Sequence, residues 1–176
     1  MYLYKALDAF PYDLEQTMES LNYALSYQPE NVQALYLMGR VHCELLGLYP
    51  EAIAYYQAAL ASNVNFQKLY PHYLDALIKN EDYQSAKHFL DFAITVKGSD
   101  KSLLTFFNGV LLEQAQDYKQ AIKVYKQAKK MSLNNNYSGF MQTQITRVKE
   151  KLPKKKKAKN KRKKRNKNKS KRKEKN

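Results

Sequence analysis

Each histidine in this chain is followed within three residues by an acidic side chain, and such pairs could support chemistry. The pairs are His42 with Glu44, His72 with Asp75, and His88 with Asp91. Residues three positions apart share one face of a helix, so a histidine and an aspartate placed in this way could bind a metal ion or transfer a proton. However, His72 and His88 fall on two different predicted helices that face different ways, and ordinary surface pairing explains them more simply.

Other signatures of catalysis are missing from the sequence. It contains no glycine-rich phosphate loop, no HExxH zinc motif and no Gly-x-Ser-x-Gly nucleophile turn. The single cysteine, Cys43, excludes an internal disulfide bond and a cysteine-based zinc cluster, and its apolar neighbours predict a buried structural thiol. We therefore expect a protein that is not an enzyme, with no catalytic residues, no metal site and no cofactor.

Basic side chains dominate residues 154–176. This segment holds 16 of the 31 lysines and arginines, and its formal charge of +15 equals that of the whole chain. It has almost no apolar residues and its like charges repel, so we predict that it is disordered. Lysine is a mobile point charge that favours phosphates over any base sequence. The residues expected to bind RNA, DNA or another polyanion are Lys154, Lys155, Lys156, Lys157, Lys161, Arg162, Lys163, Lys164, Arg165, Lys171, Arg172 and Lys173.

Other targets for this tail stay open at this point. Residues 1–100 contain 12 acids and 6 bases, whereas residues 101–153 contain 9 bases and 3 acids, so the tail could also meet an acidic protein or the acidic front of its own chain. An anionic membrane is a weaker candidate, because the sequence shows no lipid anchor and no amphipathic wedge. The tail could also serve solubility alone.

The termini and the apolar stretches indicate a cytoplasmic protein. The N-terminus has no apolar core of the kind found in secretory signals, and residues 103–112 form an apolar stretch too short to cross a bilayer. In a nucleated cell the tail would also pass as a nuclear import signal, which makes a nuclear location possible there.

The body of the chain contains an internal repeat. Small residues fall at Ala24, Ala59, Ala93 and Ala128, at intervals of 35, 34 and 35 residues. The last three each follow another alanine by seven residues, with Tyr56, Leu90 or Tyr125 between the two alanines. Upstream of each such segment lies another with large residues at fixed positions, which are Leu35, Met38 and His42, then Tyr70, Tyr73, Leu74 and Leu77, then Leu104, Phe107 and Leu111. The first copy keeps only its second half, Leu21 and Ala24.

This period and order of residues resemble the tetratricopeptide repeat, a 34-residue helix-turn-helix unit, over roughly residues 14–133. The resemblance implies an all-α fold, a right-handed superhelical stack of such repeats within residues 1–133, with more complete units at 31–64, 65–98 and 99–133. Asn31 and Asp100 are expected to cap helices. Residues 134–153 are expected to form a capping helix with the apolar stripe Tyr137, Phe140, Met141, Ile145, Val148 and Leu152 and the opposite polar face Gln142, Thr146, Arg147, Lys149 and Glu150.

In this family the first helix of each unit lines a concave groove that holds a segment of another protein. The resemblance and helical spacing together place ten residues there: Gln33, Tyr36, Arg40, Glu44, Lys68, His72, Asp75, Lys79, Thr105 and Asn108. The alternative is that these are ordinary solvated faces. Some family members grip a C-terminal carboxylate, but Tyr36 and Asp75 disturb that arrangement here.

Two functional hypotheses follow. In the first, the protein is a non-enzymatic adaptor whose groove binds a protein or peptide while the tail attracts nucleic acid nonspecifically. In the second, it is a structural or assembly subunit that uses only the repeat surface, with the tail incidental or docked on an acidic protein or a membrane. The oligomeric state stays open in both.

Overall fold

The computed structural model describes residues 1–153, which form helices and turns without any strand. The first pairs are α1 (Tyr2–Ala9) with α2 (Leu14–Tyr27), and α3 (Val32–Arg40), continued by a π-helical segment η1 (Val41–Leu46), with α4 (Tyr49–Ser62). The next are α5 (Tyr70–Lys79), preceded by the 3-10 segment η2 (Gln67–Leu69), with α6 (Tyr83–Thr95), and α7 (Lys101–Gln114) with α8 (Tyr118–Met131). The last helix is α9 (Asn135–Lys151). The predicted all-α fold is confirmed, whereas the predicted disordered tail lies outside the described residues.

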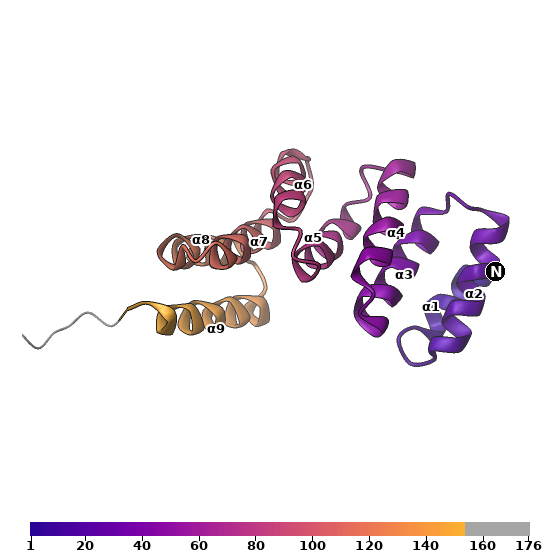
Figure 1. Ribbon diagram of the computed structural model, residues 1–176, viewed down its shortest axis with the longest axis horizontal. Helices are drawn as coiled ribbons and strands as arrows, with labels where there is room; N and C mark the ends of the chain where they lie inside the picture. Colours follow the sequence, from indigo (N-terminus) through magenta and orange to yellow (C-terminus); the bar gives the residue numbers. More distant parts are fainter. Residues whose placement is uncertain (154–176) are drawn as a thin grey trace, which may run out of the picture.

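The helices form a stack of hairpins along an elongated molecule (Figure 1). The α1–α2 hairpin lies at one end, and α9 packs along α8 at the other. Helix α1 provides a first helix for the hairpin of which the sequence pattern showed only the second half. In the part of the chain that the structure describes, no helix is long and apolar enough to cross a membrane.

Acidic and amide side chains fix where six of the helices begin. Each accepts a hydrogen bond from the backbone N–H three residues further on, which satisfies a donor that has no partner inside the helix. The capping residues are Asp13, Asn31, Asp82, Asp100, Asp117 and Asn134. The predicted caps at Asn31 and Asp100 are therefore confirmed.

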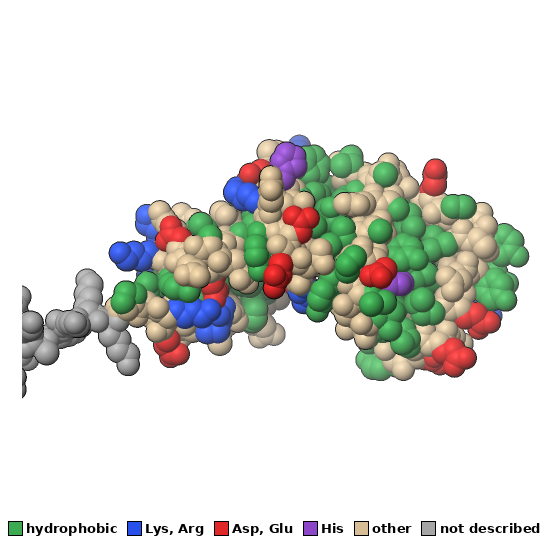
Figure 2. Space-filling view, viewed as in Figure 1, with side chains coloured by type: hydrophobic (Ala, Val, Ile, Leu, Met, Phe, Trp, Pro, Cys, Tyr) green, Lys and Arg blue, Asp and Glu red, His purple; other side chains and the backbone are tan. Residues whose placement is uncertain are grey.

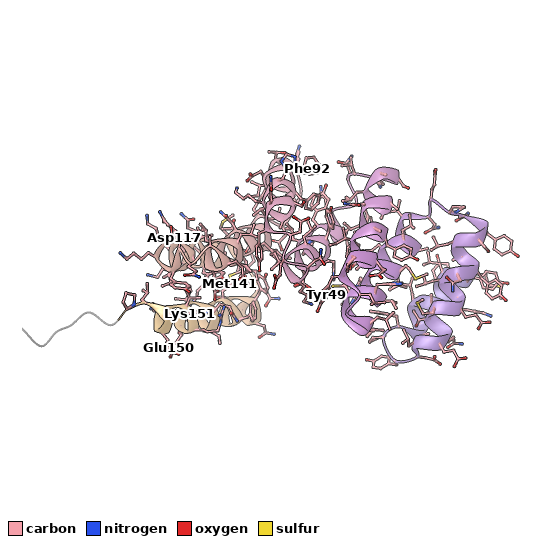
Figure 3. The ribbon with its side chains drawn as sticks, in the orientation of Figure 1. Tyr49, Phe92, Asp117, Met141, Glu150 and Lys151 are labelled. Atoms are coloured by element: carbon pink, nitrogen blue, oxygen red, sulfur yellow. The ribbon has the colours of Figure 1, made fainter. Side chains whose placement is uncertain are left out.

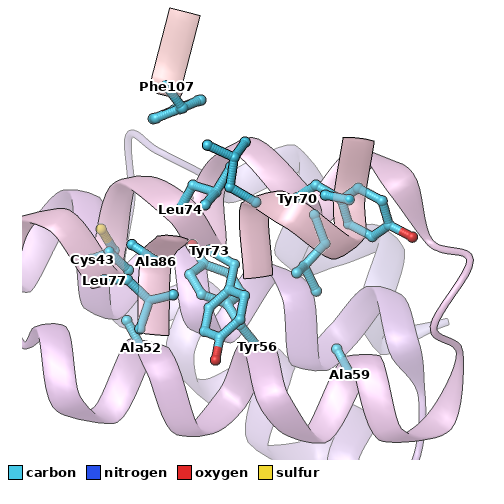
Figure 4. Packing of buried hydrophobic residues seen from close by; sticks show 14 of the residues in the cluster. Cys43, Ala52, Tyr56, Ala59, Tyr70, Tyr73, Leu74, Leu77, Ala86 and Phe107 are labelled. Carbon is cyan, nitrogen blue, oxygen red and sulfur yellow. The ribbon is translucent and has the colours of Figure 1, made fainter. Parts of the chain in front are cut away.

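The repeated alanines lie where two helices meet. Ala59, Ala93 and Ala128 are fully buried, and so are the alanines seven residues before them. Figure 4 shows Ala52 and Ala59 on either side of Tyr56 in α4. Since an alanine side chain ends at Cβ, neighbouring helices can pack closely at these positions.

In two hairpins a glycine of the first helix receives a tyrosine ring of the second. A Cβ atom at Gly39 would lie 2.5 Å from Cε1 of Tyr56, and one at Gly109 would lie 2.5 Å from Cε1 of Tyr125. Any side chain at these glycines would therefore displace a fully enclosed ring.

The other two hairpins fill the same space differently. In the third, the equivalent positions are Leu74 and Leu90, which are both fully buried in one cluster. In the first, Ala6 and Leu21 are fully buried together in another cluster. The two positions thus hold glycine and tyrosine, two leucines, or alanine and leucine, and the pairing changes from hairpin to hairpin.

The second hairpin has one extra residue inside its first helix. Gly47, which ends this helix in the left-handed conformation (φ 67°), lies eight residues after Gly39. In the fourth hairpin the left-handed residue Gln116 (φ 60°) lies seven residues after Gly109. A helix absorbs one added residue by widening a turn into a π-type turn, which is η1. In the loop before α7, Gly98 also has a left-handed backbone conformation (φ 88°).

Helix α9 covers the last hairpin with the apolar stripe predicted for it. Met141, Ile145 and Val148 are buried, and Met141 lies between α9 and the α7–α8 hairpin (Figure 3). Arg147 is 45 % exposed, as expected of a residue on the polar face, but its long side chain also reaches back to α7. Its guanidinium donates hydrogen bonds of 2.6 and 2.7 Å to the Glu113 carboxylate of α7, because that buried acid needs a compensating charge.

The Glu113 carboxylate also accepts hydrogen bonds from Lys151 (2.8 Å) and from the hydroxyl of Tyr125 (3.1 Å). Burial opposes its ionisation, but the hydrogen bonds from Arg147, Lys151 and Tyr125 outweigh that effect and lower the pKa of Glu113 below its ordinary value of 4.5. The network ties α9 to both helices of the last hairpin.

The first prediction concerns the glycine–tyrosine contact. Gly39→Ala should lower the free energy of unfolding by about 1–3 kcal/mol, because its methyl group overpacks the Tyr56 ring. Gly139→Ala in α9 is the matched control, since nothing lies within 4 Å of its Cβ position, and it should raise stability by about 0.5–1 kcal/mol. Urea unfolding followed by circular dichroism measures both. Adding Tyr56→Leu should recover part of the loss, and strict additivity would contradict the contact.

The second prediction concerns Glu113. Glu113→Gln should reduce stability at neutral pH by about 1–2 kcal/mol, because it leaves Arg147 and Lys151 without their shared anion. Since the folded pKa lies below 4.5, this contribution is fully present above about pH 4.5 and is lost as the pH falls through the folded pKa. Unfolding curves of the two proteins should therefore converge at low pH. Glu150→Gln, an exposed change on the same helix, should show no such pH-dependent difference.

Candidate functional site

The residues predicted to line a groove lie on the first helices of three successive hairpins. They are Gln33, Tyr36, Arg40 and Glu44 on α3 and η1, Lys68, His72, Asp75 and Lys79 on η2 and α5, and Thr105 and Asn108 on α7. Gln33 is exposed, and Thr105 and Asn108 are half-buried. The hydroxyl of Thr105 lies 3.9 Å from the sulfur of Met131, so this side chain contacts the second helix of its own hairpin.

Three of these residues form a polar cluster that bridges two first helices. Arg40 donates two hydrogen bonds of 2.7 Å to the two carboxylate oxygens of Glu44, one turn further along the chain. Nδ1 of His72, on α5, lies 3.2 Å from the same carboxylate. The three side chains are between 26 and 32 % exposed, so the cluster remains open to a partner.

The charge on Glu44 is stabilised by these neighbours. Burial alone would raise its pKa, but the hydrogen bonds from His72 and Arg40 and the charge of Arg40 outweigh that effect and lower the pKa of Glu44 from 4.5 to about 2. Glu44 is therefore a carboxylate at any physiological pH, and it orients both the guanidinium and the imidazole.

Tyr36 forms the floor beneath this cluster. Its side chain is 5 % exposed, and its ring packs edge-on against Phe66 and His72 with the charged ends of Arg40 and Lys68 within 6 Å. The sequence places Tyr36 among the groove-lining residues, whereas in the structure it is buried beneath them. It holds the cluster by aromatic and cation–π contacts.

Two buried hydroxyl groups lie in this region without a hydrogen-bond partner among the described residues, those of Tyr36 and Tyr56. The comparison with Tyr125 explains the second. Glu113, four residues after Gly109, accepts the hydrogen bond from Tyr125, whereas four residues after Gly39 the chain has Cys43.

The remaining polar residues of α5 form a second group. Lys79 pairs with Asp75 at 2.8 Å, and the Cys43 sulfur lies 4.0 Å from the Asp75 carboxylate. Burial, together with the nearby acids Asp75 and Glu44, raises the pKa of the Cys43 thiol despite the opposing charge of Lys79. The buried thiol predicted from the sequence therefore fits its surroundings.

The histidine–acid pairs considered for chemistry do not form as pairs. The acid that contacts His72 is Glu44, while Asp91 pairs with Lys87. The ring of His42 is buried and hydrogen-bonded to the carbonyl of Met38 at 2.9 Å. Within residues 1–153 no three histidine, cysteine or acidic side chains come together as metal ligands would.

A hollow of about 390 Å³ adjoins the cluster between the beginnings of α5 and α7. Its lining includes Lys68 and His72, together with Pro71, Leu103 and Leu104. The sequence pattern did not identify the apolar part of this lining. It also did not identify Phe10, in the α1–α2 turn, whose ring lies 4.6 Å from the guanidinium carbon of Arg40.

The predicted nucleic-acid residues, from Lys154 to Lys173, lie outside the described residues. The structure therefore places none of them relative to the groove.

Comparison with known proteins agrees with the geometry of the stack. The family model described as tetratricopeptide repeat matches residues 18–66, which run from within α2 to the residue before η2 and include Tyr36, Arg40 and Glu44. No curated protein sequence matches the chain.

Solved structures share its fold at low sequence identity. Yeast Tom70 superposes with a TM-score of 0.70 at 13 % identity, covering 85 % of this chain and 32 % of Tom70, so this chain spans about a third of that protein. PilF of Pseudomonas aeruginosa gives 0.71 at 18 % identity, with 85 % and 68 % covered. YrrB, described as a TPR protein with an unusual peptide-binding site, gives 0.63 at 19 %, with 85 % and 76 % covered. The predicted resemblance is thus confirmed: the chain contains a tetratricopeptide repeat at residues 18–66, within a tetratricopeptide-repeat fold that takes in most of the described residues.

Proposed function

We propose that this protein is a non-enzymatic adaptor that binds a segment of a partner protein across α3, η1 and α5, while its basic tail attracts nucleic acid. The observation that carries the first half is the cluster of Arg40, Glu44 and His72, which joins neighbouring first helices by hydrogen bonds and is still partly exposed. Such helices line the binding groove of this fold.

The cluster has the features of a preorganised polar site. Glu44 fixes the orientation of Arg40 and His72 before any partner arrives, so little side-chain entropy would be lost on binding. The neighbouring hollow of about 390 Å³ adds apolar lining next to these polar groups, which is the combination found in peptide and ligand sites. The peptide-binding site named for YrrB supports the same use of this fold.

The second half of the proposal concerns residues 154–176. Their charge of +15 is carried mostly by lysines with no aromatic side chain among them, which favours attraction to phosphates over reading of bases. We propose a cytoplasmic location, or a nuclear one in a nucleated cell. We also propose residues 1–133 as the repeats, 134–153 as their cap and 154–176 as the nucleic-acid segment.

One observation favours the second hypothesis, that of an assembly subunit. At the α1–α2 end the rings of Tyr2 and Tyr23 stack at 5.1 Å and those of Tyr2 and Tyr27 at 5.9 Å, and Tyr4 and Tyr12 are more than two-thirds exposed. Exposed aromatic side chains are typical of protein interfaces. A partner that docks there would leave the groove unused.

The groove is tested by His72→Ala. We expect the fold to survive and the crosslinks from a bound partner to α3 and α5 to fall by at least about tenfold, since a contact at the centre of a site carries much of its binding energy. Crosslinking mass spectrometry in native extract measures this, with Gln84→Ala on the exposed face of α6 as the matched control. Unchanged crosslinks at the groove, or crosslinks only at the α1–α2 end, would favour the assembly subunit.

The tail is tested by comparing the full chain with a chain that ends at Pro153. If six to ten tail charges meet phosphates, RNA affinity of the full chain should fall about 10³- to 10⁵-fold between 50 and 200 mM salt. Fluorescence anisotropy with a labelled RNA measures both chains. Equal affinities, or an affinity that does not depend on salt, would refute the role of the tail.

A further inference from the structure

Helix α8 carries a row of four lysines on its outer side. Lys119, Lys123, Lys126 and Lys130 follow one another at intervals of four, three and four residues, so they lie on one face of the helix, and all four are exposed. The buried residues of α8, such as Ala128, lie on the other side. We call these four residues the α8 lysine row.

No acid neutralises this row within residues 1–153. Helix α8 itself contains no acidic residue, and none of the four lysines takes part in an ion pair among the described side chains. The two nearest acids in sequence are occupied elsewhere. Asp117 caps α8 through the N–H of Gln120, and Glu113 is held by Arg147 and Lys151.

The fold does not require lysine at these positions. The four lysines lie nine, five and two residues before the repeated alanine of α8 and two residues after it. The same positions of α2 hold Glu15, Glu19, Asn22 and Ser26. Those of α4 are Pro50, Ala54, Gln57 and Ala61, and those of α6 are Gln84, His88, Asp91 and Thr95. The second helices therefore change along the stack from acidic to basic, and packing does not explain the change.

The row belongs to the end of the molecule from which the tail leaves. Helix α9 packs along α8 and ends at Lys151, three residues before the tail begins. In Figure 2 lysine and arginine side chains gather at this end, whereas the α1–α4 end shows mainly acidic and apolar side chains.

We infer that the α8 lysine row itself binds the phosphate backbone of nucleic acid, in addition to the binding proposed for residues 154–176. This inference rests on the proposed nucleic-acid role of the tail. At 1.5 Å per residue the row spans about 16 Å, a length over which one strand of nucleic acid, at about 3.4 Å per charge, carries about five phosphates. The backbone of a folded helix is already ordered, so only the side-chain entropy of the four lysines is lost when they meet phosphates.

The surroundings of the row favour nucleic acid over a membrane. The exposed residues beside it on α8 include Gln120 and Gln127, which are polar and uncharged. A helix that lies in a membrane surface needs an apolar face next to its charges, and the apolar face of α8 is occupied by packing against α7 and α9. The exposed Leu133 lies beyond the end of the helix, which makes a vesicle arm of the test worthwhile.

The test uses the full chain with all four lysines of the row changed to glutamine, a residue that keeps helix propensity and size. The probes are a single-stranded 20-nucleotide RNA, a DNA of the same sequence, and phosphatidylserine–phosphatidylcholine vesicles. For a single strand, each phosphate contact adds about 0.7 to the slope of log affinity against log salt concentration. If the row makes four contacts, the fold-change in affinity between 50 and 200 mM salt should be up to about 50 times smaller in the variant than in the wild-type protein. Anisotropy titrations at several salt concentrations give this slope.

The control removes three charges elsewhere in the full chain, at Lys5, Lys87 and Lys97, which belong neither to the groove nor to the row. It should keep the salt slope of the wild-type protein. An unchanged slope in the row variant, an equal loss in the control, or a loss seen only with vesicles would overturn the inference. The chain that ends at Pro153 separates the two proposals. If that chain loses RNA binding while the row variant keeps the wild-type salt slope, the tail binds RNA and the row does not.

Discussion

The structure depends on how closely the two helices of each hairpin approach. The fully buried alanines of the second helices remove bulk where neighbouring helices meet, and at Gly39 and Gly109 even a Cβ atom would collide with a tyrosine ring. Interiors packed to this density leave little room for adjustment. A tyrosine opposite glycine and a leucine opposite leucine are therefore two ways to fill one fixed space, and the hairpins can stack in the same way despite their different residues.

The candidate site arises from one departure from this regularity. In the fourth hairpin Glu113 lies four residues after Gly109 and accepts hydrogen bonds from the Tyr125 hydroxyl and from Arg147 of α9. In the second hairpin the added residue of η1 puts Cys43 at that spacing and Glu44 one position later, where it meets Arg40 and His72. The Tyr56 hydroxyl then has no acid to bind. The same type of residue locks a capping helix in one hairpin and forms an open polar cluster in another.

The sequence predicted the parts of this fold that repeat. The alanine interval, the caps at Asn31 and Asp100 and the stripe of α9 each follow from local patterns of residue type, and the structure has them. It could not place the extra residue, because a 35-residue interval is compatible with a longer loop or with a widened turn. It also missed the contact of Arg147 with Glu113 and misjudged the depth of Tyr36, which packs against His72, since these partners lie 34 and 36 residues away in sequence.

The second helices change from acidic to basic along the stack, so the two ends of the described molecule differ in charge. With 12 acids and 6 bases in residues 1–100 and 9 bases against 3 acids in residues 101–153, the described chain is an electric dipole aligned with its long axis. A dipole experiences a torque in the field of a highly charged polymer, so the chain would rotate during diffusional approach, before any side chain touches the target. It would arrive with α8 leading and with α1 pointing away into solution.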